Sequence, residues 1–261
     1  MNTKYLREYL KVAPASHALW RAIETNAFAA VRLHRPILDV GCGFGEFAGV
    51  FFKSRVEMGI DISRQFLLQA YEGKKYHKLL VADAREMPFA DNSFSSIVSV
   101  SVFEHIPNLE KAITECYRVL TPGGRLVFTT PSDEFTSNLF WVRLCNKIGL
   151  KLLGQAYGRE INRVFVHINL WSPERWRRIL RSAGFTIEVI KPIMSVPALT
   201  FWDLGLVLAS VSQLNKKLFG RRTLVKSPLI IRFWERRLTP LLANDHIKEH
   251  INLFIVARKH G

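Results

Sequence analysis

The sequence predicts an α/β fold in which helices cover both faces of a largely parallel sheet. Short apolar segments of strand type alternate with segments of helical periodicity from residue 37 to residue 191. The first strand-like segment ends in a glycine-rich loop that leads into a helix, and the next two end in an aspartate. In an α/β sheet the ligand lies at the carboxyl ends of the strands, so these strand ends predict the binding site.

The glycine loop lies within Ile37 to Phe47, which reads Ile-Leu-Asp-Val-Gly-Cys-Gly-Phe-Gly-Glu-Phe. Glycine has no Cβ, so it can adopt positive φ and lets the backbone touch a ligand. A dinucleotide-binding loop needs glycine at its first, third and sixth positions, but the sixth position counted from Gly41 is Glu46. Glycine at every second position after Asp39 is therefore a different pattern, unless the segment is only a glycine-rich turn.

Composition permits a full α/β core, but the charge is unusual. The 261 residues include 37 Lys and Arg against 22 Asp and Glu, a net charge of +15, and residues 191–261 hold 12 basic and 4 acidic groups. Such a surplus suits nucleic acid, anionic lipid or an acidic substrate. The three cysteines are odd in number without metal-ligand spacing, and the charged N-terminus indicates no signal peptide. A reducing, cytoplasmic setting is expected.

Acidic residues end the second and third predicted strands. The strand over 56–62 ends in Asp61, and Ser63 is a good N-cap for the helix that follows. An acid at this strand tip can accept both ribose hydroxyls of a nucleoside, although it could instead cap the next helix. The short strand over 78–83 ends in Asp83, which by itself is an ordinary turn residue.

The other segments complete an alternating order. Residues 5–31 indicate one or two amphipathic helices broken by Pro14. Further strands are predicted over 94–102, 125–130, 185–191 and 251–257, and a helix that begins at Ser172-Pro173-Glu174 and ends at Gly184 precedes the third of these.

Several motifs between residues 37 and 131 together resemble one enzyme family. They are Asp39-x-Gly41-x-Gly43-x-Gly45, Asp83-Ala-Arg-Glu-Met-Pro-Phe89, Phe103-Glu-His-Ile-Pro107 and Tyr117-Arg-Val-Leu-Thr-Pro-Gly-Gly-Arg-Leu126. In this order they resemble the class I S-adenosylmethionine-dependent methyltransferases of type 11, the group that includes quinone-biosynthesis enzymes. The resemblance implies a Rossmann-like doubly wound sheet of seven strands, mostly parallel with the last strand antiparallel.

The resemblance also implies S-adenosyl-L-methionine as cofactor and assigns its contacts. The glycine loop would lie under the methionine end, Asp61 would hold the ribose, and Asp83 would accept a hydrogen bond from the adenine amino group. The predicted cofactor-binding residues are Asp39, Gly41, Cys42, Gly43, Gly45, Asp61, Ile62, Asp83, Ala84 and Ser101. No metal site is expected.

The family pattern predicts a single methyltransferase domain over residues 1–261. Its parts would be an N-terminal helical cover over 1–35, a cofactor-binding core over 36–131, a lid over the acceptor pocket at 132–170, and an amphipathic, basic helical insertion at 192–249 between strands 6 and 7.

His105 and His167 are the predicted catalytic residues. A neutral imidazole can take a proton near pH 7, His105 follows the fourth strand at the ligand edge, and His167 resembles a pocket-facing position of related enzymes. Either histidine could instead be structural.

The insertion raises the question of a membrane. Residues 192–215 contain one charge, Asp203, which would cost about 2.5 to 3.5 kcal/mol at the centre of a spanning helix. A single crossing would also separate the last strand from the sheet. Broad apolar faces beside the cluster Lys216, Lys217, Arg221, Arg222 and Lys226 favour helices lying in an anionic head-group interface over 196–245. Folding over the core or a dimer contact are the alternatives.

The sequence thus predicts O- or C-methylation of a hydrophobic, lipid-linked or isoprenoid small molecule. The alternative is a catalytically silent methyltransferase-fold protein that serves as a membrane-associated binding partner. Location is expected in the cytoplasm, with peripheral attachment to the inner face of the membrane if the insertion binds lipid. No nucleic-acid partner is expected, because no aromatic-basic recognition motif stands outside the insertion. The oligomeric state is not predicted.

Overall fold

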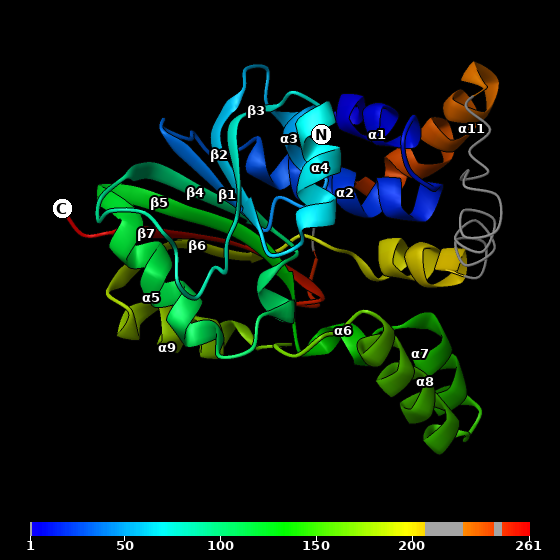
Figure 1. Cartoon of the computed structure of the whole chain (residues 1–261). Helices are drawn as coiled ribbons and strands as arrows, with labels where there is room; N and C mark the ends of the chain where they lie inside the picture. Colours follow the sequence, from blue (N-terminus) through cyan, green and yellow to red (C-terminus); the bar gives the residue numbers. More distant parts are fainter. Residues whose placement is uncertain (1, 207–226, 243–246) are drawn as a thin grey trace.

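A seven-stranded sheet forms the centre of the molecule (Figure 1). The computed structural model describes residues 2–206, 227–242 and 247–261. The strand order is β3-β2-β1-β4-β5-β7-β6, and β7 runs antiparallel to both of its neighbours while the other pairs are parallel. The strands are β1 (Ile37–Val40), β2 (Val56–Asp61), β3 (Tyr76–Val81), β4 (Phe94–Val100), β5 (Leu120–Pro131), β6 (Phe185–Pro192) and β7 (Asn252–Lys259). The predicted fold class is confirmed.

Helices lie on both faces of this sheet. The helices of the described residues, including those that extend beyond the sheet, are α1 (Thr3–Leu10), α2 (Ala15–Phe28), α3 (Glu46–Phe51), α4 (Arg64–Glu72), α5 (Leu109–Val119), α6 (Glu134–Ser137), α7 (Phe140–Lys147), α8 (Lys151–Val164), α9 (Pro173–Ser182) and α11 (Pro228–Leu238), with short 3-10 turns η1 (Phe103–His105) and η2 (Thr239–Leu242). Residues 196–206 are also helical.

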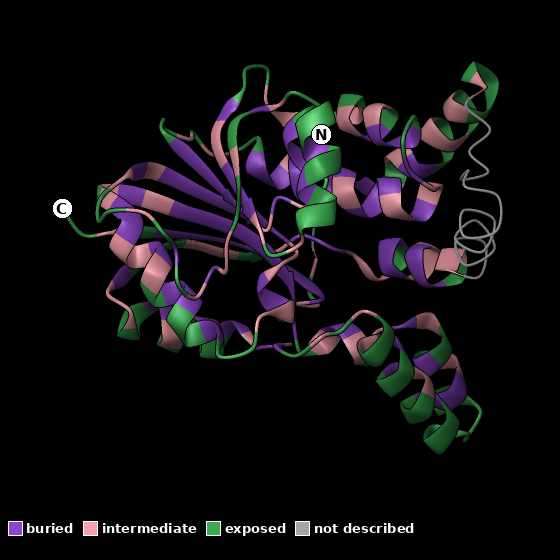
Figure 2. Cartoon of the chain, viewed as in Figure 1, coloured by how far each residue is buried: buried purple, intermediate pink, exposed green. Residues whose placement is uncertain are grey.

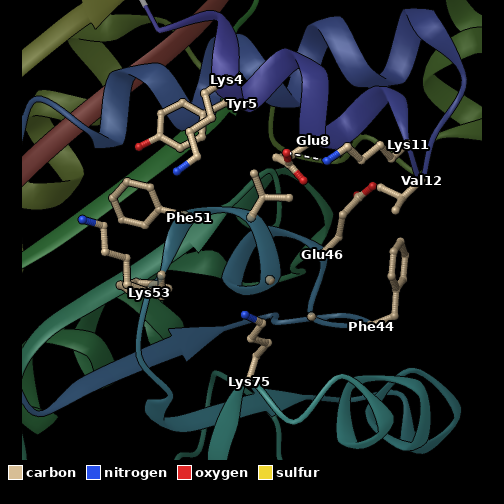
Figure 3. Close-up of a pocket in the computed structure, with 14 residues that line it drawn as sticks. Lys4, Tyr5, Glu8, Lys11, Val12, Phe44, Glu46, Phe51, Lys53 and Lys75 are labelled. Carbon is tan, nitrogen blue, oxygen red and sulfur yellow. Dashed lines mark hydrogen bonds and ion pairs between the residues drawn. The ribbon is translucent and has the colours of Figure 1, made fainter. Parts of the chain in front are cut away.

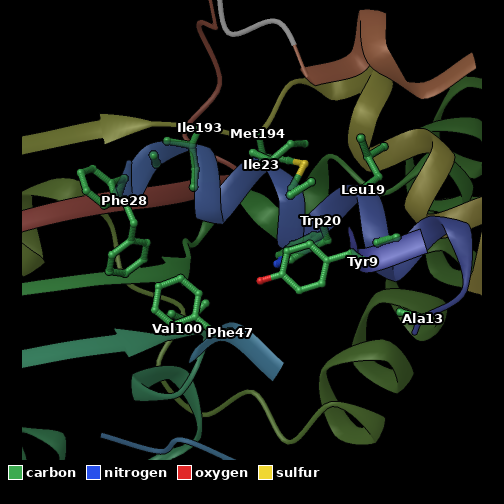
Figure 4. Close-up of a cluster of buried hydrophobic side chains, with 14 of the residues drawn as sticks. Tyr9, Ala13, Leu19, Trp20, Ile23, Phe28, Phe47, Val100, Ile193 and Met194 are labelled. Carbon is green, nitrogen blue, oxygen red and sulfur yellow. The ribbon is translucent and has the colours of Figure 1, made fainter. Parts of the chain in front are cut away.

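Two apolar cores hold these layers together. On one face α5 and α9 pack onto the sheet through buried side chains that include Ile113, Trp176 and Leu180. On the other face α1 and α2 contribute Tyr9 and Phe28 to a larger cluster (Figure 4) that also contains residues of the 196–206 helix. Burying one apolar face of each helix against a sheet is what stabilises such layered folds.

Local signals place several element boundaries. The Ser63 hydroxyl accepts a hydrogen bond from the Phe66 amide at the start of α4, as its predicted capping role requires. Gly184 after α9 has φ of +95°, and a Cβ there would lie 2.9 Å from the Tyr117 ring, so glycine is needed for both reasons. The third strand ends two residues earlier than predicted, because its parallel register pairs Asp61 with Val81 and both strands end together.

The insertion before β7 turns much of its apolar surface inward. In the 196–206 helix the side chains of Leu199, Trp202 and Asp203 are buried. Helix α11 packs beside α1, where the Arg7 guanidinium donates two hydrogen bonds of 2.9 and 3.0 Å to one Glu235 oxygen. The 196–206 part of the insertion therefore folds over the protein's own core, whereas α11 leaves Leu229, Ile230 and Phe233 exposed.

The basic cluster predicted within 216–226 lies outside the described residues. Among the helices that are described, none is both long enough and apolar enough to span a bilayer.

Candidate active site

A cavity of about 450 Å³ opens at the carboxyl ends of β1, β2 and β4. This volume lies in the usual range of small-molecule sites. Eight of the predicted site residues line it, namely Gly41, Gly43, Asp61, Ile62, Asp83, Ala84, Ser101 and His105. The parallel strands bring these residues together because each lies at or just beyond a strand end on the same sheet edge.

The glycine loop forms one wall of this cavity. Gly41, Gly43 and Gly45 have φ values of +71°, +53° and +78°, a region that other residues rarely adopt. A Cβ on Gly41 would lie 2.4 Å from a methyl group of Val102, whereas a Cβ on Gly43 would meet nothing within 4 Å. Gly41 is thus required for packing, and Gly43 leaves open space for a ligand.

Asp39 supports the loop from behind. Its side chain is buried and accepts a 2.7 Å hydrogen bond from the Tyr76 hydroxyl. Burial raises the pKa of Asp39 to about 7, although the bond from Tyr76 opposes that shift. Asp39 and Cys42 do not appear in the cavity lining, so their place in this structure is behind the loop.

Asp61 links the glycine loop to the start of the next helix, which includes the capping role that the sequence left open. Its carboxylate accepts hydrogen bonds from the backbone amides of Gly43 at 2.9 Å and Ser63 at 2.8 Å. One bond fixes the glycine loop and the other fixes the start of α4. Each carboxylate oxygen has a second lone pair, so Asp61 keeps acceptor capacity toward the cavity that it lines.

Asp83 has a partner that the sequence reasoning missed. The Arg85 guanidinium donates hydrogen bonds of 2.6, 3.0 and 3.1 Å to its carboxylate. This bonding holds the pKa of Asp83 below its ordinary value. The Arg85 backbone amide also donates to Oδ1 at 2.8 Å, so each oxygen of the expected adenine acceptor already accepts two hydrogen bonds from Arg85.

The two predicted histidines lie against each other. The rings of His105, in η1, and His167, in the loop after α8, are nearly parallel with centroids 5.7 Å apart. Nδ1 of His105 lies 3.1 Å from the Val166 carbonyl oxygen, and Nδ1 of His167 lies 3.1 Å from Oδ1 of Asn162. Burial lowers the pKa of both, to about 4 for His167. Both imidazoles are thus neutral at pH 7.

Glu24 is a second residue that the sequence reasoning missed. Its fully buried carboxylate accepts hydrogen bonds from the hydroxyls of Ser101 at 2.6 Å and Thr129 at 2.8 Å, and from Arg21 at 2.9 Å. The spacing i, i+4 from Trp20, on the inner face of α2, is the signal that could have identified it.

Glu104 is buried beside the histidines. Its Oε1 lies 3.7 Å from Nε2 of His105, and its Oε2 has no hydrogen-bond partner in the part of the chain that is described. Burial raises the pKa of Glu104 to about 8, so the side chain is mainly protonated at pH 7. The buried Glu104, the two histidines and Arg21 place several polar groups next to the cavity wall.

A second cavity, of about 590 Å³, lies between α1 and the start of α3 (Figure 3). Phe44 lines both cavities, whereas Gly45 lines only this one. Apolar side chains such as Phe51 form its walls, and Lys4, Lys11, Lys53 and Lys75 line it as well. Glu8 and Glu46 also line it, and Lys11 forms an ion pair with Glu8 at 2.7 Å.

Comparison with known proteins identifies the family. A family model described as a methyltransferase domain matches residues 38–128. The ubiquinone/menaquinone biosynthesis C-methyltransferase UbiE of Desulfotalea psychrophila is 32% identical over 170 residues, which cover 60% of this chain and 68% of that enzyme. The chain belongs to the type 11 group of class I S-adenosylmethionine-dependent methyltransferases.

Other relatives of this methyltransferase act on different acceptors. The malonyl-[acyl-carrier protein] O-methyltransferase of Methylococcus capsulatus is 37% identical over 132 residues, but the match spans only 47% of this chain and 48% of that enzyme, about half of its length. The family is therefore established, while the acceptor is not fixed by similarity.

Solved structures share the fold of this methyltransferase at low identity. Phosphoethanolamine N-methyltransferase 2 of Haemonchus contortus, in complex with S-adenosyl-L-methionine, has a TM-score of 0.53 and 22% identity over 92% of this chain and 52% of that one. The [4+2]-cyclase SpnF has a TM-score of 0.57 and 18% identity over 92% of this chain and 81% of its own. A cyclase among these neighbours means that the fold alone does not determine the reaction.

Proposed function

We propose that this methyltransferase transfers a methyl group from S-adenosyl-L-methionine to an oxygen or carbon of a hydrophobic, lipid-linked or isoprenoid small molecule. The observation that carries the proposal is the joint placement of the glycine loop, Asp61 and His105 around one strand-end cavity, with His167 stacked on His105. Family membership and the acceptors of the relatives support the reaction class.

The residues of the cavity fit this cofactor. Gly43 leaves a space that a Cβ would fill. Asp61, at the tip of the neighbouring strand β2, keeps free lone pairs that can accept hydrogen bonds from a ligand. Ile62 is 72% exposed at the cavity wall and offers an apolar surface to a base. When bound, the cofactor would supply an electrophilic methyl group with a good leaving group.

His105 is proposed as the base that removes a proton from an oxygen acceptor. Its Nδ1 donates to the Val166 carbonyl, which leaves the lone pair on Nε2. His167 stacks on it and orients the ring, while the rest of the work is to align the reactants and exclude water.

Aromatic side chains around His167 support a hydrophobic acceptor. Phe135 contacts the His167 ring edge-to-face at 5.2 Å, and Phe165 stacks on it at 5.8 Å. Trp202 packs against both phenylalanines. These rings give His167 a largely apolar environment, which suits an apolar acceptor.

Two measurements test this proposal. Isothermal calorimetry should detect binding of S-adenosyl-L-methionine by the wild-type protein and clearly weaker binding by Asp61→Asn, with the exposed change Glu160→Gln as control. Incubation with lipid extracts should then yield a product heavier by one methyl group, and His105→Gln should slow its formation without weakening cofactor binding. Near wild-type turnover by His105→Gln would exclude that residue as the base.

A catalytically silent binding protein is the second candidate. The ion pair between Asp83 and Arg85 favours it, because the expected adenine partner is already engaged. Absence of cofactor binding in the calorimeter would leave only this candidate.

A further inference from the structure

Four large aliphatic side chains are exposed together at the tip of the helical hairpin formed by α7 and α8, residues 140–164. Ile148 is 59% exposed, Leu150 51%, Leu152 79% and Leu153 58%. These four residues lie within six consecutive positions, 148–153, around the turn between the two helices. Scattered apolar residues on a surface are normal, but a contiguous apolar group of this kind marks an interaction site.

The turn holds these side chains in a fixed position. Gly149 has φ of +84°, the Leu150 amide donates to the Cys145 carbonyl at 2.8 Å, and the Gly149 amide donates to the Asn146 carbonyl at 3.3 Å. These two bonds form the Schellman arrangement that ends a helix. The tip is therefore an ordered turn.

Close packing of the two helices leaves the tip residues outside. A Cβ on Gly154 would lie 3.1 Å from Cβ of Cys145, and a Cβ on Gly158 would lie 2.5 Å from a methyl group of Thr136. The two glycines let α8 approach its neighbours closely. Buried Val142 and Cys145 fill this contact, and the tip leucines lie outside it.

The charge around the tip has one sign. Residues 135–159 contain Arg143, Lys147, Lys151 and Arg159 but no aspartate or glutamate. Lys147 and Lys151, on either side of the turn, have no ion-pair partner among the residues that the structure places. An apolar tip flanked by cations is complementary to an anionic head-group layer over hydrocarbon.

The hairpin extends away from the rest of the molecule at its tip and is attached to the 196–206 helix at its base. It projects away from the sheet in Figure 1, and its outer surface is exposed in Figure 2. None of its residues lines the strand-end cavity. At its base, Asp203 accepts hydrogen bonds from the Tyr157 hydroxyl and the Trp141 amide, which ties the hairpin to the 196–206 helix.

We propose that the tip of this hairpin, residues 147–153, docks the protein on an anionic lipid surface. The leucines and Ile148 enter the boundary between head groups and acyl chains, and the flanking lysines contact anionic head groups. This assignment differs from the sequence prediction, which gave membrane contact to 196–245. Docking of the tip on lipid requires neither cofactor binding nor turnover. A test of this proposal is therefore independent of the proposed function.

Vesicle sedimentation tests the assignment. The wild-type protein should sediment with vesicles of phosphatidylglycerol and phosphatidylcholine, more weakly with pure phosphatidylcholine, and less as salt rises. The variant Leu152→Gln/Leu153→Gln should bind anionic vesicles at least about tenfold more weakly, because it withdraws apolar surface from the bilayer. The matched variant Leu229→Gln/Phe233→Gln, which changes exposed residues of α11, should bind like wild type.

Equal binding by the tip variant and wild type would overturn the proposal, as would failure of the wild type to bind anionic vesicles. Loss of binding only in the α11 variant would return membrane contact to 196–245. Circular dichroism would confirm that both variants are folded. A concentration-dependent dimer that dissociates in the tip variant, without vesicle binding, would assign the tip to a second copy instead.

A fluorescent label adds a positional readout. The three native cysteines are all buried, so a cysteine introduced at an exposed site can be labelled selectively. Leu153→Cys and Leu68→Cys form a matched pair, because both leucines are helical and 58% exposed. An environment-sensitive dye should shift to the blue on anionic vesicles at position 153 but not at 68, and equal shifts at both would contradict docking through the tip.

Discussion

Glu24 connects three parts of the fold beneath the candidate site, so its removal tests the energetics of that region. The carboxylate joins α2 to Ser101 after β4, to Thr129 in β5 and, through a 3.3 Å bond, to Asn252 in β7. Glu24, Thr129 and Asn252 are at most 1% exposed. Glu24→Ala would leave the Thr129 and Asn252 donors without this acceptor and without access to water.

The expected cost follows from that burial. A buried polar group that loses its partner costs about 1–3 kcal/mol, and Glu24→Ala leaves two such groups, the Thr129 hydroxyl and the Asn252 amide. The Arg21 side chain keeps 23% exposure, so water screens its lost pairing and it adds little. We therefore expect Glu24→Ala to lower the free energy of unfolding by about 3–5 kcal/mol, a large part of the total for a domain.

Urea unfolding at pH 7, followed by circular dichroism, measures this change. Glu24→Gln keeps one acceptor oxygen and should lose about 1–2 kcal/mol. Glu160→Ala removes an exposed pair with Arg163 and should change stability by less than about 1 kcal/mol. A loss for Glu24→Ala no larger than that of Glu160→Ala would refute the reasoning.

Three further predictions concern the loop, the titrating groups and the hairpin base. Gly41→Ala and Gly43→Ala should each lower the free energy of unfolding by about 1–2 kcal/mol, because alanine is strained in the left-handed backbone region. Gly41→Ala should lose about 1–3 kcal/mol more, because its Cβ would clash with Val102. Unfolding curves and cofactor calorimetry should show that Gly43→Ala is folded but binds the cofactor weakly. The lowered pKa of His167 predicts that the stability of the protein falls as pH drops from 6.5 toward 4, because the unfolded chain binds that proton first. The raised pKa of Glu104 predicts that stability falls as pH rises from 4.5 toward 8, because the unfolded chain loses that proton first. In urea titrations at several pH values, His167→Gln should abolish only the first dependence and Glu104→Gln only the second. Asp203→Ala should cost about 2–4 kcal/mol, because a tyrosine hydroxyl and a backbone amide lose their buried acceptor, and a loss below 1 kcal/mol in the same assay would contradict this.

The parts of the site that the sequence predicted are those that lie close together along the chain. The glycine loop, Asp61 and Ser63 carry their geometry locally, since a positive φ, a strand tip and an N-cap each depend on a few neighbouring residues. The strand order then follows from the family pattern. The third strand was misplaced by two residues because only pairing with β2, and not its own composition, determines where it ends.

Contacts between residues that lie far apart along the chain could not be predicted from the sequence in the same way. The pairing of His105 with His167 brings together two histidines that the sequence nominated separately. Glu104 was passed over, although it adjoins His105, because nothing in its spacing indicates burial. The engagement of Asp83 by Arg85 depends on side-chain rotamers, which a motif does not encode.

Amphipathic segments show most clearly where sequence reasoning stops. A helical periodicity indicates that one face is apolar but does not indicate what covers that face. In the 196–206 helix the covering surface is the protein's own core, where Trp202 contacts Trp20. The tip at 147–153 is short and lacks a clear periodicity of its own, and the family pattern included it in the lid predicted over 132–170. The leucines of the tip are distinguished only by the packing of α8 on α7, which leaves them exposed.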